Sequence, residues 1–434
     1  MSDIALEGGP NMPAGSKERT AAAAVWTSET MRRRVASRYA AERRFRGIGL
    51  FAVLLSGGFL AFLLITMAYK GVGGFTQTEI RLPVDFASIS AGVTPEALSG
   101  AKGDETMATL DLETLVNAAA KAQFGEEGPS LLSEGAWLSL RSALQADPSL
   151  VNQKTELWVP ASGEVDRAAK GDADPAAERQ LGALKAQHRV KTGFSTIFLS
   201  SSDSTDPTVV GIWGAFKGTL LTMLVTAILA FPVGMLAAVY LEEYAPRNRW
   251  TDLIEVSINN LAAVPSIIFG LLGLAVFLNF FNMPRSAPIV GGLTLALMTM
   301  PVIVIAGRNA IKAVPPSIRD AALAMGASRV QVVFHHVLPL AMPGILTGAI
   351  IGMARALGET APLIMIGMRA FISSPPSGFT EPATVLPVQI FLWSDEVSQG
   401  FVEKTSAAIV VLLLFLMTMN ATAIYFRNRF ERRW

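Results

Sequence analysis

The 434-residue chain contains no cysteine and only three histidines, and only 16% of its residues are charged. Without cysteine, disulfide bonds, thiolate catalysis and cysteine-ligated metals are excluded. Three histidines leave little room for a histidine metal site, so we expect no metal site. An ordinary soluble domain has about 25% charged residues. The low charge content therefore argues against a plain soluble enzyme.

The dipeptide Gly-Lys is also absent from the whole chain. The P-loop motif G-x-x-x-x-G-K-[ST] contains this dipeptide, so the sequence predicts no P-loop nucleotide site. We therefore expect no catalytic residues and no cofactor in this chain.

Apolar residues make up 51% of the chain and are concentrated in long runs. A helix needs roughly 20 mostly apolar residues to cross a bilayer. Six windows satisfy this requirement: 48–69, 219–241, 258–281, 287–306, 344–368 and 407–426. Only the fifth window contains Asp, Glu, Lys or Arg, namely Arg355 and Glu359. The sequence therefore predicts an all-α polytopic membrane protein with six transmembrane helices.

Arginines flank both ends of this membrane region. The leader 1–47 and the tail 427–434 contain Arg32, Arg33, Arg34, Arg38, Arg43, Arg44, Arg46, Arg427, Arg429, Arg432 and Arg433. Because Lys and Arg accumulate on the cytoplasmic side, we expect both termini in the cytoplasm, which an even number of crossings allows. The first window follows a long polar leader and is interpreted as a retained anchor, not as a cleaved signal peptide.

The segment 70–211 is expected outside the cytoplasm. Residues 71–211 contain 11 basic and 19 acidic side chains, a net charge of −8. The pattern is typical of a strand over 79–86 and of a helix over 134–146, so we expect a small inserted α+β domain. An acidic surface is a poor capture site for an anion, and we therefore expect this domain to be structural or to contact a partner.

The 313–339 segment between the fourth and fifth windows reads AVPPSIRDAALAMGASRVQVVFHHVLP. Pro315 and Pro316 are expected to end the preceding helix, and Ser317 to cap a short new helix that Gly326 interrupts. Taken alone, this pattern is equally compatible with a helical hairpin that lies on the membrane surface.

The spacing of this segment resembles the EAA signature of ABC importer permeases. That signature is Glu-Ala-Ala, three residues, Gly, nine residues, Ile, one residue and Leu-Pro; here Asp320 replaces Glu and His336 replaces Ile. In that family the segment forms a coupling helix that fits a groove on the ATPase subunit. The resemblance therefore implies that the ATPase contacts are made by Asp320, Ala321, Ala322, Gly326, Leu338 and Pro339.

Four further stretches resemble the PstA-type permeases of phosphate ABC importers. They are GAFKGTLLTMLVTAILAFPVGMLAAVYLEEYAP from Gly214, NLAAVPSIIFGLLGL from Asn260, RALGETAPLI from Arg355 and LPVQIFLW from Leu386. The resemblance implies a type I (MetI-like) permease core over 212–426 in a bacterial inner membrane. The implied partners are a PstC-type permease, a PstB-type ATPase dimer that uses the ATP, a PstS-type extracytoplasmic phosphate-binding protein and membrane lipid, but no nucleic acid.

Charged residues within the fifth window are candidates for the anion pathway. Arg355 and Glu359 are four residues apart and are expected to share one helix face. A charge at the bilayer centre costs on the order of 2.5–3.5 kcal/mol, so the pair should face protein or a water-filled route. It could line that route or only brace the helix bundle. Arg308, at the inner end of the fourth window, is a second pathway candidate or a charge that marks the inner face.

Three alternatives stay open at this point. The chain could be a permease for another oxyanion, such as sulfate or molybdate. It could be a membrane sensor whose 70–211 segment detects a ligand outside, which predicts a cytoplasmic output domain. It could also be an ion-coupled secondary transporter, which predicts buried carboxylates in several helices.

Overall fold

The computed structural model describes residues 29–88, 93–99, 103–171, 175–369 and 371–430. Most of the expected leader, residues 1–28, and the tail arginines Arg432 and Arg433 lie outside the described residues. The chain divides into two units, Met1–Thr66 and Met67–Trp434, and each is described by itself.

The first unit contributes most of helix α2 (Glu29–Gly74), whose last eight residues belong to the second unit. The stretch Arg33–Gly74 is long and apolar enough to cross a membrane, and none of its most apolar part is buried. Large side chains such as Phe51, Leu54 and Phe59 are exposed along it. A helix that is apolar on all sides is suited to lipid rather than to water, and the predicted window 48–69 lies within it.

A three-stranded antiparallel sheet follows in the second unit, with strand order β2-β1-β3. The strands are β1 (Thr76–Asp85), β2 (Lys154–Pro160) and β3 (Val190–Phe194). In the register, Ile80 of the central strand lies opposite Val159 on one side and Val190 on the other. Ile80, Leu82 and Val84 are buried because alternate side chains of a strand point to one face.

Short helices pack around this sheet. They are η1 (Phe86–Ser88), α3 (Pro95–Ser99), α4 (Gly103–Ala108), α5 (Leu112–Phe124), η2 (Gly128–Leu131), α6 (Trp137–Ala146), η3 (Pro148–Asn152), α7 (Gly163–Lys170) and α8 (Pro175–Ala186). Leu115 and Val116 of α5 and Leu140 of α6 share one hydrophobic core with the inner face of β1. The strand expected over 79–86 coincides with most of β1, and the helix expected over 134–146 begins three residues later.

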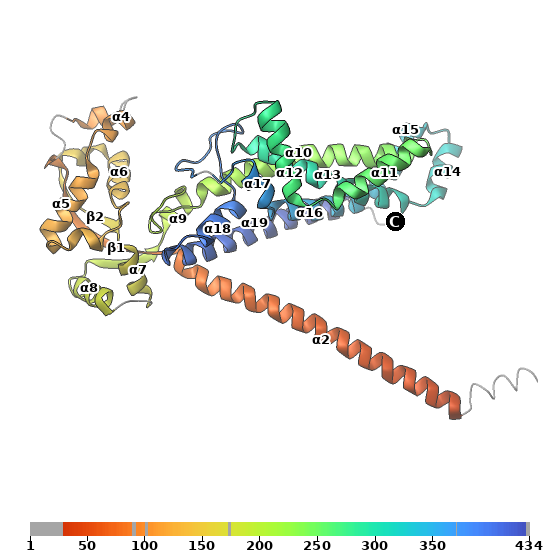
Figure 1. Ribbon diagram of the computed structural model, residues 1–434, viewed down its shortest axis with the longest axis horizontal. Coiled ribbons are helices and arrows are strands. Elements are labelled where there is room, and N and C mark those ends of the chain that lie inside the picture. The colour runs from red at the N-terminus through yellow and green to blue at the C-terminus, as the bar shows by residue number, and fades with distance from the viewer. Residues whose placement is uncertain (1–28, 89–92, 100–102, 172–174, 370, 431–434) are drawn as a thin grey trace, which may run out of the picture. The chain divides into compact units, whose positions relative to one another are not determined.

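The remaining helices form the apolar part of the second unit (Figure 1). They are α9 (Thr196–Ser200), α10 (Trp213–Val239), η4 (Tyr240–Tyr244), α11 (Arg249–Ala262), α12 (Ser266–Gly273), η5 (Leu274–Phe280), α13 (Pro288–Lys312), α14 (Pro316–Ala324), α15 (Arg329–Gln331), η6 (Val332–Val337), α16 (Leu338–Leu357), α17 (Ala361–Met365), α18 (Leu386–Ser394) and α19 (Gly400–Phe430). Here η4, η5 and η6 are turns of π-helix.

Helix α13 packs against both α10 and α16. On the side of α16 that faces α13, glycine recurs at every fourth position, at Gly344, Gly348 and Gly352. A Cβ atom added at Gly348 would lie 2.1 Å from Cβ of Ala306 on α13. Small residues at such a contact let two helix backbones approach closely, as is common between helices in a membrane.

The third apolar window, 258–281, is not one straight helix. The helix axis bends by 102° between Arg249–Ala262 and Ser266–Phe280. Pro265 lies at the bend as the N-cap of α12, and proline cannot donate the backbone hydrogen bond that would continue a helix. The prediction of a continuous helix was therefore wrong. In the described residues five helices are long and apolar enough to cross a membrane, or six if this bent pair is one span.

The fifth apolar window, 344–368, was also placed wrongly as one helix. Helix α16 begins earlier, at Leu338, and ends at Leu357, where Gly358 is the C-cap residue. The short helix α17 then begins at Ala361, with Pro362 in its first turn. Because proline is accepted at a helix start and not in a helix interior, the chain begins a new helix there.

Candidate functional site

The 313–339 segment forms a compact hairpin between α13 and α16. Helix α14 begins at Pro316 with Pro315 as its N-cap, so Ser317 lies inside the helix and the prediction that it caps was wrong. Proline fits the first helical position because its missing N–H group is not needed there. Gly326 has a φ of +86°, a left-handed conformation that favours glycine. Ser328 and Gln331 then form a capping box at the start of α15.

The residues of the EAA-like motif divide into a buried and an exposed set. Ala322 and Leu338 are buried, together with Val332 and Val333, in a core shared with the ends of α13 and α16. The side of α14 that carries Asp320 and Ala321 is exposed, and Gly326, which follows the helix, is exposed as well. Pro339 is half-buried in the first turn of α16.

Apolar side chains add to the exposed surface of this hairpin. Met325 is 89% exposed, and Leu323 and Val330 are also exposed. His336, which occupies the isoleucine position of the motif, is exposed as well. The hairpin therefore presents a small, partly apolar surface with a single carboxylate, Asp320, on α14.

Arg319 fixes this hairpin to the rest of the bundle. Its Nη2 atom lies 2.7 Å and its Nε atom 3.1 Å from Oε1 of Glu243 in η4. The same guanidinium donates hydrogen bonds to the carbonyl oxygens of Val314 at 2.7 Å and Ile311 at 3.0 Å. Ile311 lies in the last turn of α13, where backbone acceptors lack partners within the helix, and Val314 follows the helix end. Glu243 was not identified from the sequence.

Arg308, the second pathway candidate, lies between two carboxylates. Its Nη2 atom is 2.8 Å from Oε2 of Glu255 in α11, and its Nε atom is 3.4 Å from Oε2 of Glu242 in η4. The arginine side chain is only 13% exposed. This arrangement joins α13, η4 and α11, and neither glutamate was predicted from the sequence.

Arg355 and Glu359 meet, although not on one helix face as expected. Arg355 lies in the last turn of α16, whereas Glu359 follows the helix end. Arg355 Nε is 3.5 Å from Glu359 Oε1, and the side chains are 48% and 18% exposed. Among the described residues the guanidinium thus makes one long contact with a carboxylate, and about half of its side chain is exposed.

Asp203, between α9 and α10, accepts three hydrogen bonds on one carboxylate oxygen. The donors are Gln389 Nε2 at 2.8 Å, Trp393 Nε1 at 3.1 Å and the Ser204 amide at 3.1 Å. Burial raises the pKa of the Asp203 carboxyl above its ordinary value, while the three hydrogen bonds act in the opposite direction. A signal for this contact was present, since Gln389 and Trp393 are four residues apart on α18 and each needs a partner when buried.

Helix α18 is also attached to α10. The amide of Leu386, the first residue of α18, donates a hydrogen bond of 2.8 Å to Thr219 Oγ1. Together with the Asp203 contacts, this bond fixes both ends of the helix that carries LPVQIFLW. Among the described residues, no group of three or more His, Asp or Glu side chains could hold a metal ion.

Comparison with known proteins gives two family matches. The family described as the binding-protein-dependent transport system inner membrane component matches residues 230–434. A domain of unknown function, DUF3333, matches residues 32–179. The sheet-containing part and the helix bundle thus match separate families.

Individual relatives resemble about half of the chain. The phosphate transport system permease protein PstA 1 of Mycobacterium tuberculosis (strain CDC 1551 / Oshkosh) is 33% identical over 225 residues, which are 51% of this chain and 72% of the relative. The probable ABC transporter permease protein YqgI of Bacillus subtilis is 31% identical over 52% of this chain and 81% of the relative. A solved structure of the MetNI methionine ABC transporter matches with 19% identity and a TM-score of 0.41 over 51% of this chain and 98% of that chain.

Proposed function

The chain belongs to the PstA family of phosphate transport permeases, and from this membership we propose that it forms half of the translocation pathway of an ATP-driven phosphate importer. It is a multi-pass inner-membrane permease subunit with a MetI-like helical core, and it is not itself the ATPase. The observation that carries the proposal is the match to PstA permeases together with the exposed hairpin at 313–339.

The proposed topology has six crossings, with the bent pair α11 and α12 counted as one. Arginines in the first half of α2 and in the last turn of α19 support a cytoplasmic location of both termini. With the first crossing in α2, the sheet-containing 70–211 segment lies outside as an inserted α+β domain. The net charge of −8 over residues 71–211 supports a structural or partner-binding role for it rather than capture of an anion.

Energy must come from a partner. Phosphate near neutral pH carries more than one negative charge, and a negative-inside potential opposes its entry by about 2.3 kcal/mol per charge per 100 mV. The chain has no P-loop, and the hairpin at 313–339 presents Asp320, Ala321 and Gly326 to a partner. We infer that a PstB-type ATPase dimer binds this surface and that its closure changes which side of the bundle is open.

The remaining partners are a PstC-type second permease and a PstS-type phosphate-binding protein. Arg355 is the proposed contact for the transported anion, because a guanidinium matches two phosphate oxygens at once. Glu359 holds it by one contact of 3.5 Å and limits how tightly the anion binds. Conduction requires a site that attracts without trapping.

Co-purification of the assembled complex tests the proposal. Asp320→Lys and Gly326→Val change exposed positions of the hairpin, and valine also disfavours the left-handed conformation at 326. We expect loss of the ATPase and of phosphate uptake from both variants. The control is Glu126→Gln, which alters an exposed ion pair with Lys121 and should retain both.

Two results would overturn the proposal. One is concentration of phosphate by vesicles that contain this chain without an ATPase. The other is sulfate or molybdate uptake that excess phosphate does not inhibit, which would assign the chain to another oxyanion.

A further inference from the structure

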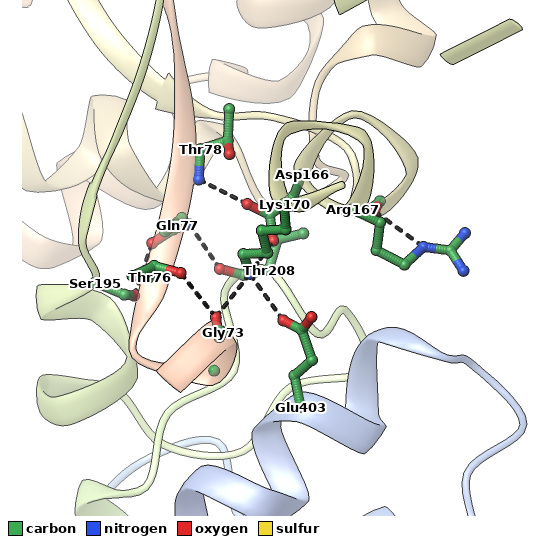
Figure 2. A network of polar contacts seen from close by, with 12 residues as sticks. Gly73, Thr76, Gln77, Thr78, Asp166, Arg167, Lys170, Ser195, Thr208 and Glu403 are labelled. Carbon is green, nitrogen blue, oxygen red and sulfur yellow. Dashed lines mark hydrogen bonds and ion pairs between the residues drawn. The ribbon is translucent and has the colours of Figure 1, made fainter. Parts of the chain in front are cut away.

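Three segments of the second unit meet at the start of α19. They are the last turn of α2, helix α7 of the sheet-containing segment, and the first turn of α19 (Figure 2). The contacts among them join residues 97 to 330 positions apart in the sequence. The residues of this joint include none of the 313–339 hairpin and do not include Arg355.

Lys170 of α7 lies at the centre of the joint. Its ammonium group is 2.7 Å from Asp166 Oδ2, 2.9 Å from Glu403 Oε2 of α19, and 2.7 Å from the carbonyl oxygen of Gly73. The side chains of Lys170, Asp166 and Glu403 are 10%, 14% and 29% exposed. Asp166 also accepts a hydrogen bond of 2.7 Å from the amide of Thr78, so α7 is tied to β1 as well.

Lys404 makes a second charged contact beside the first. Its side chain is buried, its ammonium group donates a hydrogen bond of 2.9 Å to the carbonyl oxygen of Gly74, and it lies 5.1 Å from the ring centre of Phe198. Two lysines from different elements thus bind the last carbonyls of α2. A helix C-terminus carries partial negative charge and favours cations there.

Close packing accompanies these charges. A Cβ atom added at Gly74 would lie 2.5 Å from the carbonyl oxygen of Glu403 and 2.7 Å from Cβ of Ala407. A Cβ atom at Gly73 would lie 2.8 Å from the Glu403 carboxylate. The last turn of α2 and the first turns of α19 therefore leave no room for a side chain between them.

We propose that Lys170 and Lys404 are positioning residues that fix the sheet-containing segment to the start of α19, so that the two move as one rigid body during transport. Opening the joint would break the hydrogen bonds from Lys170 to Glu403 and Gly73 and from Lys404 to Gly74, and would separate the closely packed turns at Gly74, which is unfavourable. Because the joint stays closed, any partner that moves the sheet-containing segment also moves α19. The inference rests on the proposed function only for the statement that the core changes conformation.

A cross-link tests whether the joint stays closed. Arg167 Nη1 lies 2.5 Å from Gln399 Oε1, directly before α19. The chain contains no cysteine, so Arg167→Cys with Gln399→Cys introduces its only thiols. A reducible bis-thiosulfonate reagent applied to the intact complex in membranes should join them efficiently, and phosphate uptake should stay within twofold of the unlinked complex. Loss of uptake that a reductant reverses would overturn the proposal.

The lysine is tested by the yield of the same cross-link. Lys170→Met should lower the yield at least fivefold, whereas Lys170→Arg should retain more than half of it. Lys121→Met, which removes an exposed ion pair of similar length, is the matched control and should leave the yield unchanged. If Lys170→Met does not accumulate in membranes, Glu403→Gln replaces it. An unchanged yield in Lys170→Met, or in Glu403→Gln where that variant replaces it, would refute the role of Lys170. This result is decisive even if the complex transports no phosphate and the proposed function fails.

Discussion

Replacement of Arg319 by glutamine should loosen the 313–339 hairpin from the bundle. The substitution removes both contacts to Glu243 and both hydrogen bonds to the carbonyls of Ile311 and Val314. The carboxylate of Glu243, only 12% exposed, is then left without its cation. The carbonyl of Val314, just after α13, also loses this donor, whereas that of Ile311 keeps the hydrogen bond from the Val314 amide.

The magnitude follows from burial. Removing one member of a fully buried ion pair costs about 3–5 kcal/mol. Arg319 is 22% exposed, so water replaces part of the lost interaction, and a hydrogen bond to a charged group alone accounts for about 1.5–3 kcal/mol. We expect about 2 kcal/mol, which corresponds to a roughly thirtyfold decrease in the ratio of docked to undocked α14.

Hydrogen exchange of the α14 amides in the detergent-solubilised chain measures this ratio, because exchange proceeds from the undocked state. Arg319→Gln should accelerate exchange over 316–324 by roughly the same factor of thirty, calculated at about 1.4 kcal/mol per tenfold change. Arg329→Gln is the control, because Arg329 lies in the same hairpin and is exposed. If both variants exchange at the native rate, the guanidinium does not hold the hairpin and the reasoning fails.

Two further predictions concern Arg355 and Asp203. Arg355→Gln should abolish phosphate uptake while the complex still assembles, and normal uptake by that variant would remove Arg355 from the pathway. Asp203→Asn retains the oxygen that accepts three hydrogen bonds and removes a buried charge. Because the raised pKa of Asp203 makes the folded state bind its proton more tightly, native stability should fall as pH rises from the ordinary carboxyl pKa through the raised value. The Asn variant should lack this fall and be at least as thermally stable at pH 7, whereas Asp203→Ala should lose about 1–3 kcal/mol; a less stable Asn variant would contradict this account.

The sequence predicted the parts of this structure that depend on local composition. The spans around α2, α10, α13 and α19 were found because an uninterrupted apolar run is visible without knowledge of its neighbours. The hairpin boundaries followed from Pro315, Pro316 and Gly326 for the same reason. The strand β1 was visible from its alternation of apolar and polar residues.

Features that depend on residues far apart were missed. The bend at Pro265 was not predicted, because proline within an apolar run can either kink a helix or end it, and packing decides between the two. The carboxylates that hold Arg308 and Arg319 precede them by 53 to 76 residues. No local pattern pairs these charges. The joint around Lys170 was missed for the same reason, because Glu403 is 233 residues away from Lys170 in the sequence.

The two arginines proposed for the anion route differ in what already neutralises them. Arg308 is 13% exposed and lies within 2.8 and 3.4 Å of two carboxylates, so an entering anion would have to displace a glutamate or face both. Arg355 is 48% exposed and has one carboxylate at 3.5 Å, so its guanidinium can bind a second anion without losing its first partner. Among these two positions the geometry therefore favours Arg355 for substrate contact and Arg308 for joining α13 to η4 and α11. Arg308→Gln should therefore lower the stability of the permease before it lowers the affinity for phosphate. Arg355→Gln should lower the affinity for phosphate before it lowers the stability.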